Sequence, residues 1–275
     1  MMKKINIMKK TGKKISGYLL ITTIFLVCFL YIRFPGQAVQ SYLLNTMAER
    51  YPSVSFSLQS VSLGFPPGLI MENILLGFNG NPESSARLES LRIRPRLSGY
   101  LVGRTSFAIT ALAYGGDVKG RVNFPHLALD TMPASVEIAL QNVNLERIAY
   151  LKERLGRQIS GKLSGAYTYR GDSQFDFTVQ NGTYQLVDKL VGIDRLEFSR
   201  AEVQITLKGS LMKVNKLTLT GDKMNISLKG DIVLNSEFKN SEINLTGTME
   251  LAAMNNRKVS LLITGTIGNA KTRYL

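Results

Sequence analysis

Three patterns of hydrophobic and polar residues follow one another along the chain. The first is a run of eighteen uncharged residues from Ile15 to Ile32, with lysines before it and Arg33 after it. At ~1.5 Å of rise per residue, a helix of this length covers roughly 27 Å, close to the hydrocarbon core of a bilayer. The run therefore predicts a membrane-spanning signal-anchor helix over residues 15–33.

The charges on the two sides of this run differ. Six lysines and no acidic residue precede it: Lys3, Lys4, Lys9, Lys10, Lys13 and Lys14. Cytoplasmic flanks of membrane helices carry an excess of lysine and arginine. The asymmetry predicts a cytoplasmic basic tail over residues 1–14 and one pass through the membrane, with the bulk of the chain exported.

A cleaved signal peptide is the alternative interpretation of the same run. Gly36-Gln37-Ala38 offers small residues at a cleavage site. Against cleavage, the run is longer than the ~7–15 residues usual for the apolar region of a signal peptide. Tyr31 and Phe34 also stand before the small residues, and these features favour a retained anchor.

The second pattern predicts an amphipathic helix within residues 34–52. Pro35 and Gly36 end the first run, and apolar Val39, Leu43 and Met47 then recur at helical spacing. The polar face is not lysine-rich, as it usually is in helices that lie on a membrane. We therefore expect this helix to pack against the domain that follows it.

The third pattern is an alternation of apolar and polar residues that begins at Val54. It predicts a mainly β domain over residues 53–275, which would be periplasmic in this topology. One exception is Asn144 to Leu155, where apolar residues return to helical spacing. Central glycines in Asn225 to Leu234 and in Glu242 to Leu251 permit a bend. The fold class expected is a curved antiparallel sheet, a trough or half-open barrel, with two short helices.

The alternation is broken at several points in the C-terminal half. These breaks predict separate short strands at Ser173 to Gln180, Thr183 to Val187, Leu196 to Phe198 and Glu202 to Lys208. Turn signals about 8–12 residues apart are typical of antiparallel all-β domains.

The charge and cysteine content narrow the classes of partner. The net charge is +14, from 34 basic and 20 acidic residues. The basic residues outside the tail are scattered along predicted strands without interleaved aromatic residues, so we expect no nucleic-acid partner. A mildly basic face near anionic lipid headgroups is the simpler interpretation. Cys28, the only cysteine, lies inside the predicted span and excludes disulfides from the exported part.

Candidate catalytic chemistry is sparse. His126 is the only histidine, and it stands in a proline-flanked loop without a second imidazole or thiolate to complete a metal site. The acidic residues Asp172 and Asp176, or Asp222 and Asp231, are typical of solvated strand ends. We therefore predict no enzyme, no catalytic, cofactor-binding or metal-binding residues, and no cofactor.

Three stretches together resemble a known family. They are LGFPPGLIMENI at residues 63–74, NVNLERI at 142–148 followed by ISGKLSG at 159–165, and ITGTIG at 263–268. With the preceding span and amphipathic helix, this order resembles the type II secretion system protein N family. The helix followed by ISGKLSG is also similar to AsmA-like and TamB-like inner-membrane proteins.

The resemblance implies a non-enzymatic accessory component of the type II protein secretion system, in the bacterial inner membrane. Its periplasmic β domain would act as a scaffold for other secretion-system proteins. The alternative resemblance implies lipid transport between the inner and outer membranes, with phospholipid acyl chains held in a β groove.

Whether one apolar face of the predicted sheet is open distinguishes these two functions. Its alternating apolar residues are Ile205, Leu207, Leu217, Leu219, Ile226, Leu228, Ile232 and Leu234. If they line an open trough, acyl chains fit there. A sheet of ten or more strands is only roughly 50 Å long at ~4.8 Å per strand, short for a conduit that crosses the periplasm alone. On this ground the sequence favours a trough that is closed by its own side chains, where no lipid fits, and therefore the scaffold.

Overall fold

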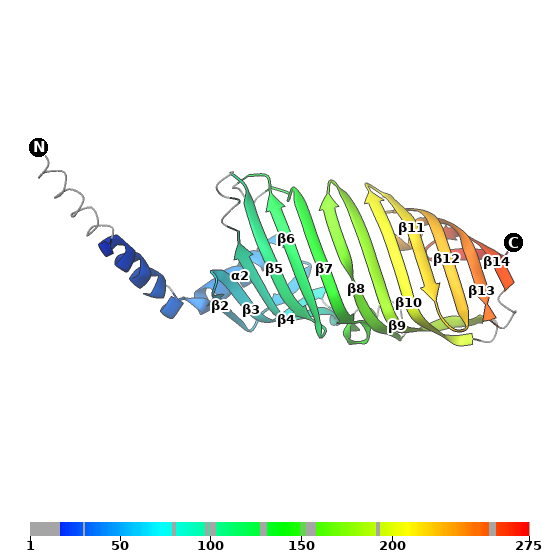
Figure 1. Cartoon of the computed structure of the whole chain (residues 1–275), viewed down its shortest axis with the longest axis horizontal. Helices are drawn as coiled ribbons and strands as arrows, with labels where there is room; N and C mark the ends of the chain where they lie inside the picture. Colours follow the sequence, from blue (N-terminus) through cyan, green and yellow to red (C-terminus); the bar gives the residue numbers. More distant parts are fainter. Residues whose placement is uncertain are drawn as a thin grey trace, which may run out of the picture.

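A computed structural model describes most of the chain. The described residues are 17–29, 31–78, 81–96, 99, 103–126, 131–149, 151, 158–190, 193–252 and 257–274. Figure 1 shows a row of strands side by side, with a helical segment projecting from the N-terminal end.

The N-terminal segment is helical over residues 17–29, and its large apolar side chains are exposed. Among the described residues, no helix is both long enough and apolar enough to cross a membrane. Of the helix predicted over residues 15–33, residues 17–29, 31 and 32 are helical. Residues 15, 16 and 30 of that prediction, and the predicted tail over residues 1–14, lie outside the described residues.

The predicted amphipathic helix is present as α2 (Gly36–Arg50). Pro35 precedes it, and the Tyr51 amide donates a hydrogen bond to the Met47 carbonyl at its end. Val39, Leu43 and Leu44 pack against buried side chains of the first strands. The Gln40 side chain also donates a hydrogen bond to the Leu58 carbonyl at 2.9 Å. The helix therefore packs on the sheet.

The rest of the described chain is dominated by one antiparallel sheet of 15 strands, and 64% of the residues are in strands. The strands are β1 (Val54–Ser57), β2 (Ser60–Gly64), β3 (Gly68–Phe78), β4 (Asn81–Pro95), β5 (Thr105–Ala113), β6 (Gly116–Phe124), β7 (Ser135–Asn144), β8 (Ile159–Arg170), β9 (Asp172–Leu190), β10 (Ile193–Lys208), β11 (Leu211–Thr220), β12 (Met224–Val233), β13 (Glu242–Leu251), β14 (Arg257–Thr266) and β15 (Asn269–Tyr274).

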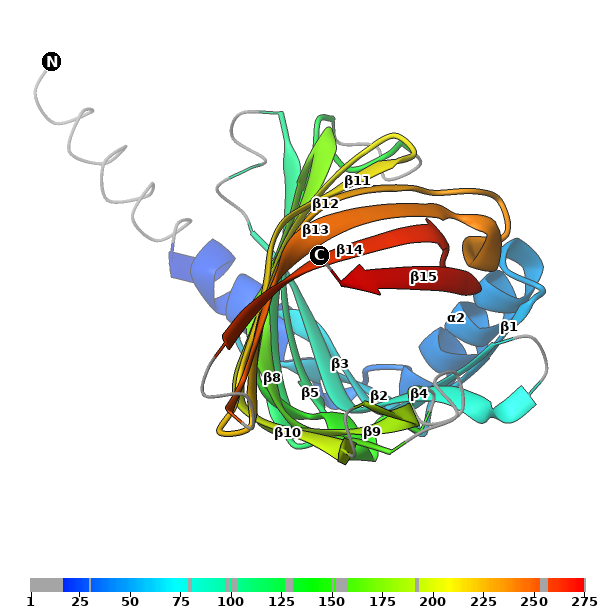
Figure 2. The ribbon, with the colours of Figure 1, turned by 90° about the vertical axis from the view of Figure 1, so that its right-hand side faces the viewer.

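Each strand from β3 onward pairs with the next one along the chain, while β1 and β2 both pair with β3. The end-on view in Figure 2 shows that the strands curl around a central axis and that the sheet does not close. This confirms the expectation of a mainly β, antiparallel, open sheet. Thirteen steps along the path from β1 to β15, at ~4.8 Å each, give a length of roughly 62 Å.

The second predicted helix, Asn144 to Leu155, is wrong over its first residues. Asn144 ends β7 and pairs with Lys162 of β8, and the 3-10 turn η1 (Leu145–Arg147) follows. Residues 149 and 151 are helical, as predicted. Leu145, one of the apolar residues that gave this segment its helical spacing, is buried directly after β7. Residues 150 and 152–155 of the predicted helix lie outside the described residues. The other described 3-10 turn is η2 (Phe238–Asn240).

Glycine is required at one of the strand bends predicted from the sequence. Gly230 in β12 has φ +148°, and a Cβ atom there would overlap the carbonyl oxygen of Asn244 on β13. We expect Gly230→Ala to lower the free energy of unfolding by roughly 2–3 kcal/mol, because both the backbone conformation and the neighbouring strand resist a side chain.

Urea unfolding of the full chain in detergent, followed by far-UV circular dichroism, measures this change. Gly209→Asn is the matched control, because Gly209 lies at a turn with φ +59° and no atom lies within 4 Å of the point that a Cβ atom would occupy there. Asparagine tolerates that conformation, so the control should change stability by less than about 0.5 kcal/mol. Equal costs at both positions would contradict the close-approach argument.

Candidate functional site

The strand register places apolar residues in continuous rows across the inner face of the sheet. One row crosses twelve strands with an apolar residue or glycine at every step. Its members are Leu69, Ile93, Ile109, Gly120, Ile138, Tyr167, Phe175, Ile205, Val214, Gly230, Leu245 and Ile263. Because side chains alternate between the faces of a strand, one row of this kind marks one face.

A second inner row runs parallel to the first. It consists of Met71, Leu91, Ala111, Val118, Leu140, Gly165, Phe177, Val203, Leu217, Leu228, Gly247 and Leu261. No member carries a charge. The concave surface of the curled sheet is therefore an apolar trough that runs across the strands.

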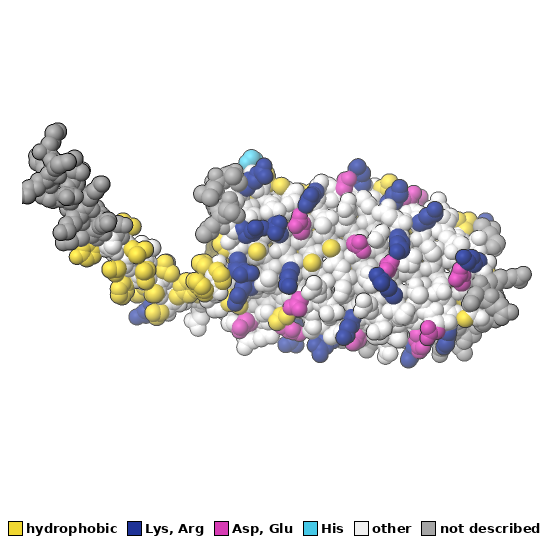
Figure 3. All heavy atoms as spheres, in the orientation of Figure 1, with side chains coloured by type: hydrophobic (Ala, Val, Ile, Leu, Met, Phe, Trp, Pro, Cys, Tyr) yellow, Lys and Arg dark blue, Asp and Glu magenta, His cyan; other side chains and the backbone are white. Residues whose placement is uncertain are grey.

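The outer face has the opposite character. The corresponding outer row is Arg94, Ala108, Arg121, Glu137, Thr168, Gln174, Thr206, Lys213, Asp231, Asn244, Thr264 and Lys271. Figure 3 shows this convex face, with charged side chains spread over it and few apolar ones. Along the length of the sheet, apolar side chains thus lie on the inner face, and most polar and charged ones lie on the outer face.

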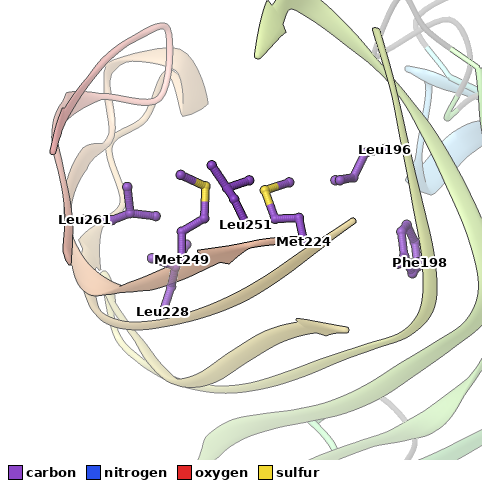
Figure 4. Close-up of a cluster of buried hydrophobic side chains, with 7 residues drawn as sticks. All are labelled: Leu196, Phe198, Met224, Leu228, Met249, Leu251 and Leu261. Atoms are coloured by element: carbon purple, nitrogen blue, oxygen red, sulfur yellow. The ribbon is translucent and has the colours of Figure 1, made fainter. Parts of the chain in front are cut away.

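Both ends of the trough are filled by the protein itself. At the N-terminal end, α2 covers buried Leu58, Val61, Met71 and Ile74. At the C-terminal end, side chains from β10, β12, β13 and β14 form a second buried cluster, drawn in Figure 4. This C-terminal cluster consists of Leu196, Phe198, Met224, Leu228, Met249, Leu251 and Leu261.

The middle of the trough is not filled in this way. In the first inner row, every residue from Ile93 on β4 to Ile205 on β10 is only half-buried. A neighbouring inner row, through Phe107, Val122, Val136 and Leu207, is also half-buried. Six strand spacings at ~4.8 Å make this open section about 29 Å long. The structure therefore presents a partly exposed apolar surface between two closed ends.

Aromatic side chains line the open section. The Tyr167 and Phe175 rings lie 4.9 Å apart, and the Phe175 and Phe177 rings lie 6.1 Å apart. The Tyr167 hydroxyl lies 3.2 Å from the Ser173 hydroxyl, so its polar end has a partner within the sheet. The rings therefore offer an apolar surface with little unmet hydrogen-bonding demand.

The charged groups on the outer face form ion pairs that leave the trough unaffected. Arg170 donates a hydrogen bond to Glu137 at 2.7 Å, and this bond, with Arg121 at 3.9 Å, holds the pKa of Glu137 below its ordinary value. Glu202 accepts a hydrogen bond from Lys216 and lies beside Arg200, which also lowers its pKa. These ion pairs stabilise the ionised form of both carboxylates.

The structure places most of the apolar face predicted from the sequence inside the trough. Seven of the eight residues belong to inner rows: Ile205, Leu207, Leu217, Leu219, Ile226, Leu228 and Ile232. Leu234 follows the end of β12. Of these seven, Leu228 belongs to the C-terminal cluster, Leu217, Leu219 and Ile226 pack against that cluster, and Ile205 and Leu207 face the open section.

The titratable residues singled out in the sequence lie apart from the trough. His126 is exposed in the loop after β6. Asp172 lies 3.2 Å from Lys208, and the Asp176 carboxylate accepts a hydrogen bond from Gln204, so each carboxylate has its own outer-face partner. Within the described ranges, no group of three or more His, Cys, Asp or Glu side chains could hold a metal ion.

Comparison of the chain with protein-family models, with curated proteins and with solved structures found no match. The open section of the trough, with its two closed ends, is the candidate functional site. Sequence alternation located its lining, and the amphipathic pattern predicted that α2 packs against the sheet. The C-terminal cluster was not predicted, because its members come from four strands that the curl of the sheet brings together.

Proposed function

We propose that this protein is a membrane-anchored, non-enzymatic lipid-binding protein that holds an acyl chain in the open section of its trough. The observation that carries the proposal is the run of half-buried apolar side chains from β4 to β10. Exposed apolar patches of this extent on soluble surfaces usually mark a site for an apolar partner. The trough has no charge along its inner rows, which suits acyl chains better than peptides.

The dimensions fit such a ligand. A bilayer's hydrocarbon core is about 30 Å thick, so one acyl chain in a leaflet spans roughly 15 Å. The open section, about 29 Å long, exceeds that length. Each methylene removed from water contributes about 0.8 kcal/mol, so even a chain that is half covered gains on the order of 5 kcal/mol.

The N-terminal segment supports the membrane part of the proposal. Leu19, Leu20, Ile24, Phe25 and Phe29 are between 53% and 72% exposed, so the helical segment offers its apolar side chains to its surroundings. Such a segment is stabilised when lipid covers it. We propose that it anchors the protein in the bacterial inner membrane with the lysine-rich tail in the cytoplasm, which would leave the sheet in the periplasm.

Photocrosslinking in nanodiscs tests this function. The full chain is reconstituted with a phospholipid that carries a diazirine on its acyl chain, and crosslinked peptides are identified by mass spectrometry. We expect crosslinks to the inner residues of β5 to β10 in addition to those in the N-terminal segment. Crosslinks confined to residues 17–32 would overturn lipid binding in the trough while leaving the anchor intact.

A scaffold in the type II secretion system is the second candidate, and the free edge of the sheet favours it. All six residues of β15 are exposed, and among the described strands β15 pairs only with β14. An unpaired edge strand is a site for strand addition by a partner. Co-purification of other inner-membrane secretion proteins, lost when Thr272 is replaced by proline, would support this role. The open middle of the trough makes us rank lipid binding first.

A further inference from the structure

Five cationic side chains gather on the outer face of β4 and β6. They are Arg92, Arg94 and Arg96 near the end of β4, and Lys119 and Arg121 on β6. We propose that this basic patch binds the headgroups of anionic phospholipids in the membrane that the N-terminal segment enters. The proposal rests on the proposed membrane anchor and is independent of whether the trough holds lipid.

The strand register brings these side chains together. Arg92 pairs with Thr110, which pairs with Lys119, and in the next outer row Arg94 pairs with Ala108, which pairs with Arg121. Two strand spacings separate β4 from β6, so the cations of each row lie about 10 Å apart. Arg96, Lys119 and Arg121 also line a hollow of about 390 Å³.

The floor of this hollow is made of small side chains. Ala139 and Ala166 pair with each other on the outer face of β7 and β8, and Ala108 lies on β5, on the other side of β6. Glu137 also lines the hollow. Short side chains leave the surrounding cations free to converge on one anionic group above the floor. A phosphate in a headgroup, with its strong acceptor oxygens, suits such a rim of arginine and lysine.

The charges of the patch are poorly balanced by acids. Arg121 lies 3.9 Å from Glu137, whose carboxylate is held more closely by Arg170 at 2.7 Å. Arg92, Arg94, Arg96 and Lys119 form no ion pair with a described carboxylate. Further along the face, Lys208 pairs with Asp172 and Lys258 with Glu250. Figure 3 shows cationic side chains close together at the end nearest the N-terminal segment.

Direct contacts connect the patch to the end of the N-terminal segment. The Tyr31 hydroxyl donates a hydrogen bond to the Gly64 carbonyl at 2.9 Å. The Arg92 guanidinium lies 3.5 Å from the point where a Cβ atom would stand on Gly64. The patch therefore begins where the exposed apolar segment leaves the sheet. A membrane that surrounds that segment brings its headgroups to this end of the sheet, and this is why we choose a lipid surface as the partner.

Fluorescence quenching in nanodiscs tests the patch. A fluorophore is placed on Thr110→Cys, between Arg92 and Lys119, in a full chain in which Cys28 is replaced by serine. The quencher is a phosphatidylcholine with a spin label on its headgroup. We expect strong quenching in discs with about 30% phosphatidylglycerol, and little in neutral discs or in about 0.5 M salt.

The variant Arg92→Gln, Arg94→Gln, Lys119→Gln should weaken this docking on the order of a hundredfold, because each cation near an anionic surface contributes about 1 kcal/mol. The matched control removes three outer-face cations at the far end, Lys213→Gln, Lys229→Gln and Lys271→Gln, and should leave quenching unchanged. A fluorophore on Thr264→Cys should remain unquenched throughout.

Two results would overturn the proposal. One is equal quenching in neutral and anionic discs, and the other is equal loss in the two triple variants. Salt acts on the unmodified charges, so the salt result decides the question even if the triple variant fails to fold. Size-exclusion chromatography of the discs shows separately whether the chain is anchored, so failure of the anchor is distinguished from failure of the patch.

Discussion

Replacing Ile205 with glutamate should reduce acyl-chain crosslinking to β5 through β10 by more than about tenfold. Ile205 lies at the end of the open section, in an inner row between Phe175 and Val214. A carboxylate at that point must either lose its hydration beside the acyl chain or hold water in the trough. Either outcome weakens the binding free energy of the acyl chain by several kcal/mol, and about 1.4 kcal/mol corresponds to a tenfold change in affinity.

The neighbouring residue supplies the control for this variant. Thr206 follows Ile205 on β10 but belongs to the outer row, where it pairs with Gln174 and Lys213. Thr206→Glu adds the same charge to the same strand on the opposite face. It should preserve crosslinking to the trough, and crosslinks in residues 17–32 should be unchanged in both variants. If Thr206→Glu reduces crosslinking as much as Ile205→Glu does, the side of the sheet does not matter and the trough is not the lipid site.

The alternation of residues was enough to predict the sheet and its inner face. The predicted strand Glu242 to Leu251 coincides with β13, and Asn225 to Leu234 differs from β12 by one residue at each end. In these strands apolar residues and a central glycine alternate with mostly polar residues, so the side of each residue follows directly from the period of two. The same regularity explains why seven of the eight predicted inner residues were placed correctly.

The long strands were not predicted, because bulges interrupt the alternation without ending the strand. The sequence suggested a break between Gln180 and Thr183, but β9 runs through it from Asp172 to Leu190. Asn181 there has φ +50°, and the Phe198 ring occupies the place where Gly182 would carry a side chain. The strand thus bends at one irregular residue and continues, as a β-bulge allows.

The accessibility of the trough depends on contacts between distant parts of the chain. Ile205 and Leu228 look alike in the alternation, yet the first is half-buried in the open section and the second is buried in the C-terminal cluster. The difference arises because Leu228 packs with side chains of β10, β13 and β14 in that cluster, of which Ile205 is not a member. The period of two predicts on which face of the sheet a residue lies, but it does not predict which side chains pack against that residue.

The C-terminal cluster should supply a large part of the stability of the sheet. Leu251 at the end of β13 is 2% exposed and lies among Met224, Met249 and Leu196 in Figure 4. We expect Leu251→Ala to lower the free energy of unfolding by about 2–5 kcal/mol, because it removes buried methyl groups and leaves a cavity that methionine side chains fill only in part. Urea unfolding of the full chain in detergent measures the change.

Leu211→Ala provides the comparison, because Leu211 begins β11 and is 44% exposed. Its loss should cost less than about 1 kcal/mol, since it leaves no cavity. If the cluster closes the trough at this end, Leu251→Ala should also let acyl-chain crosslinks spread from β5 to β10 into β12 and β13. A loss of stability without that spread would mean that the cluster supports the sheet but does not set the end of the lipid site.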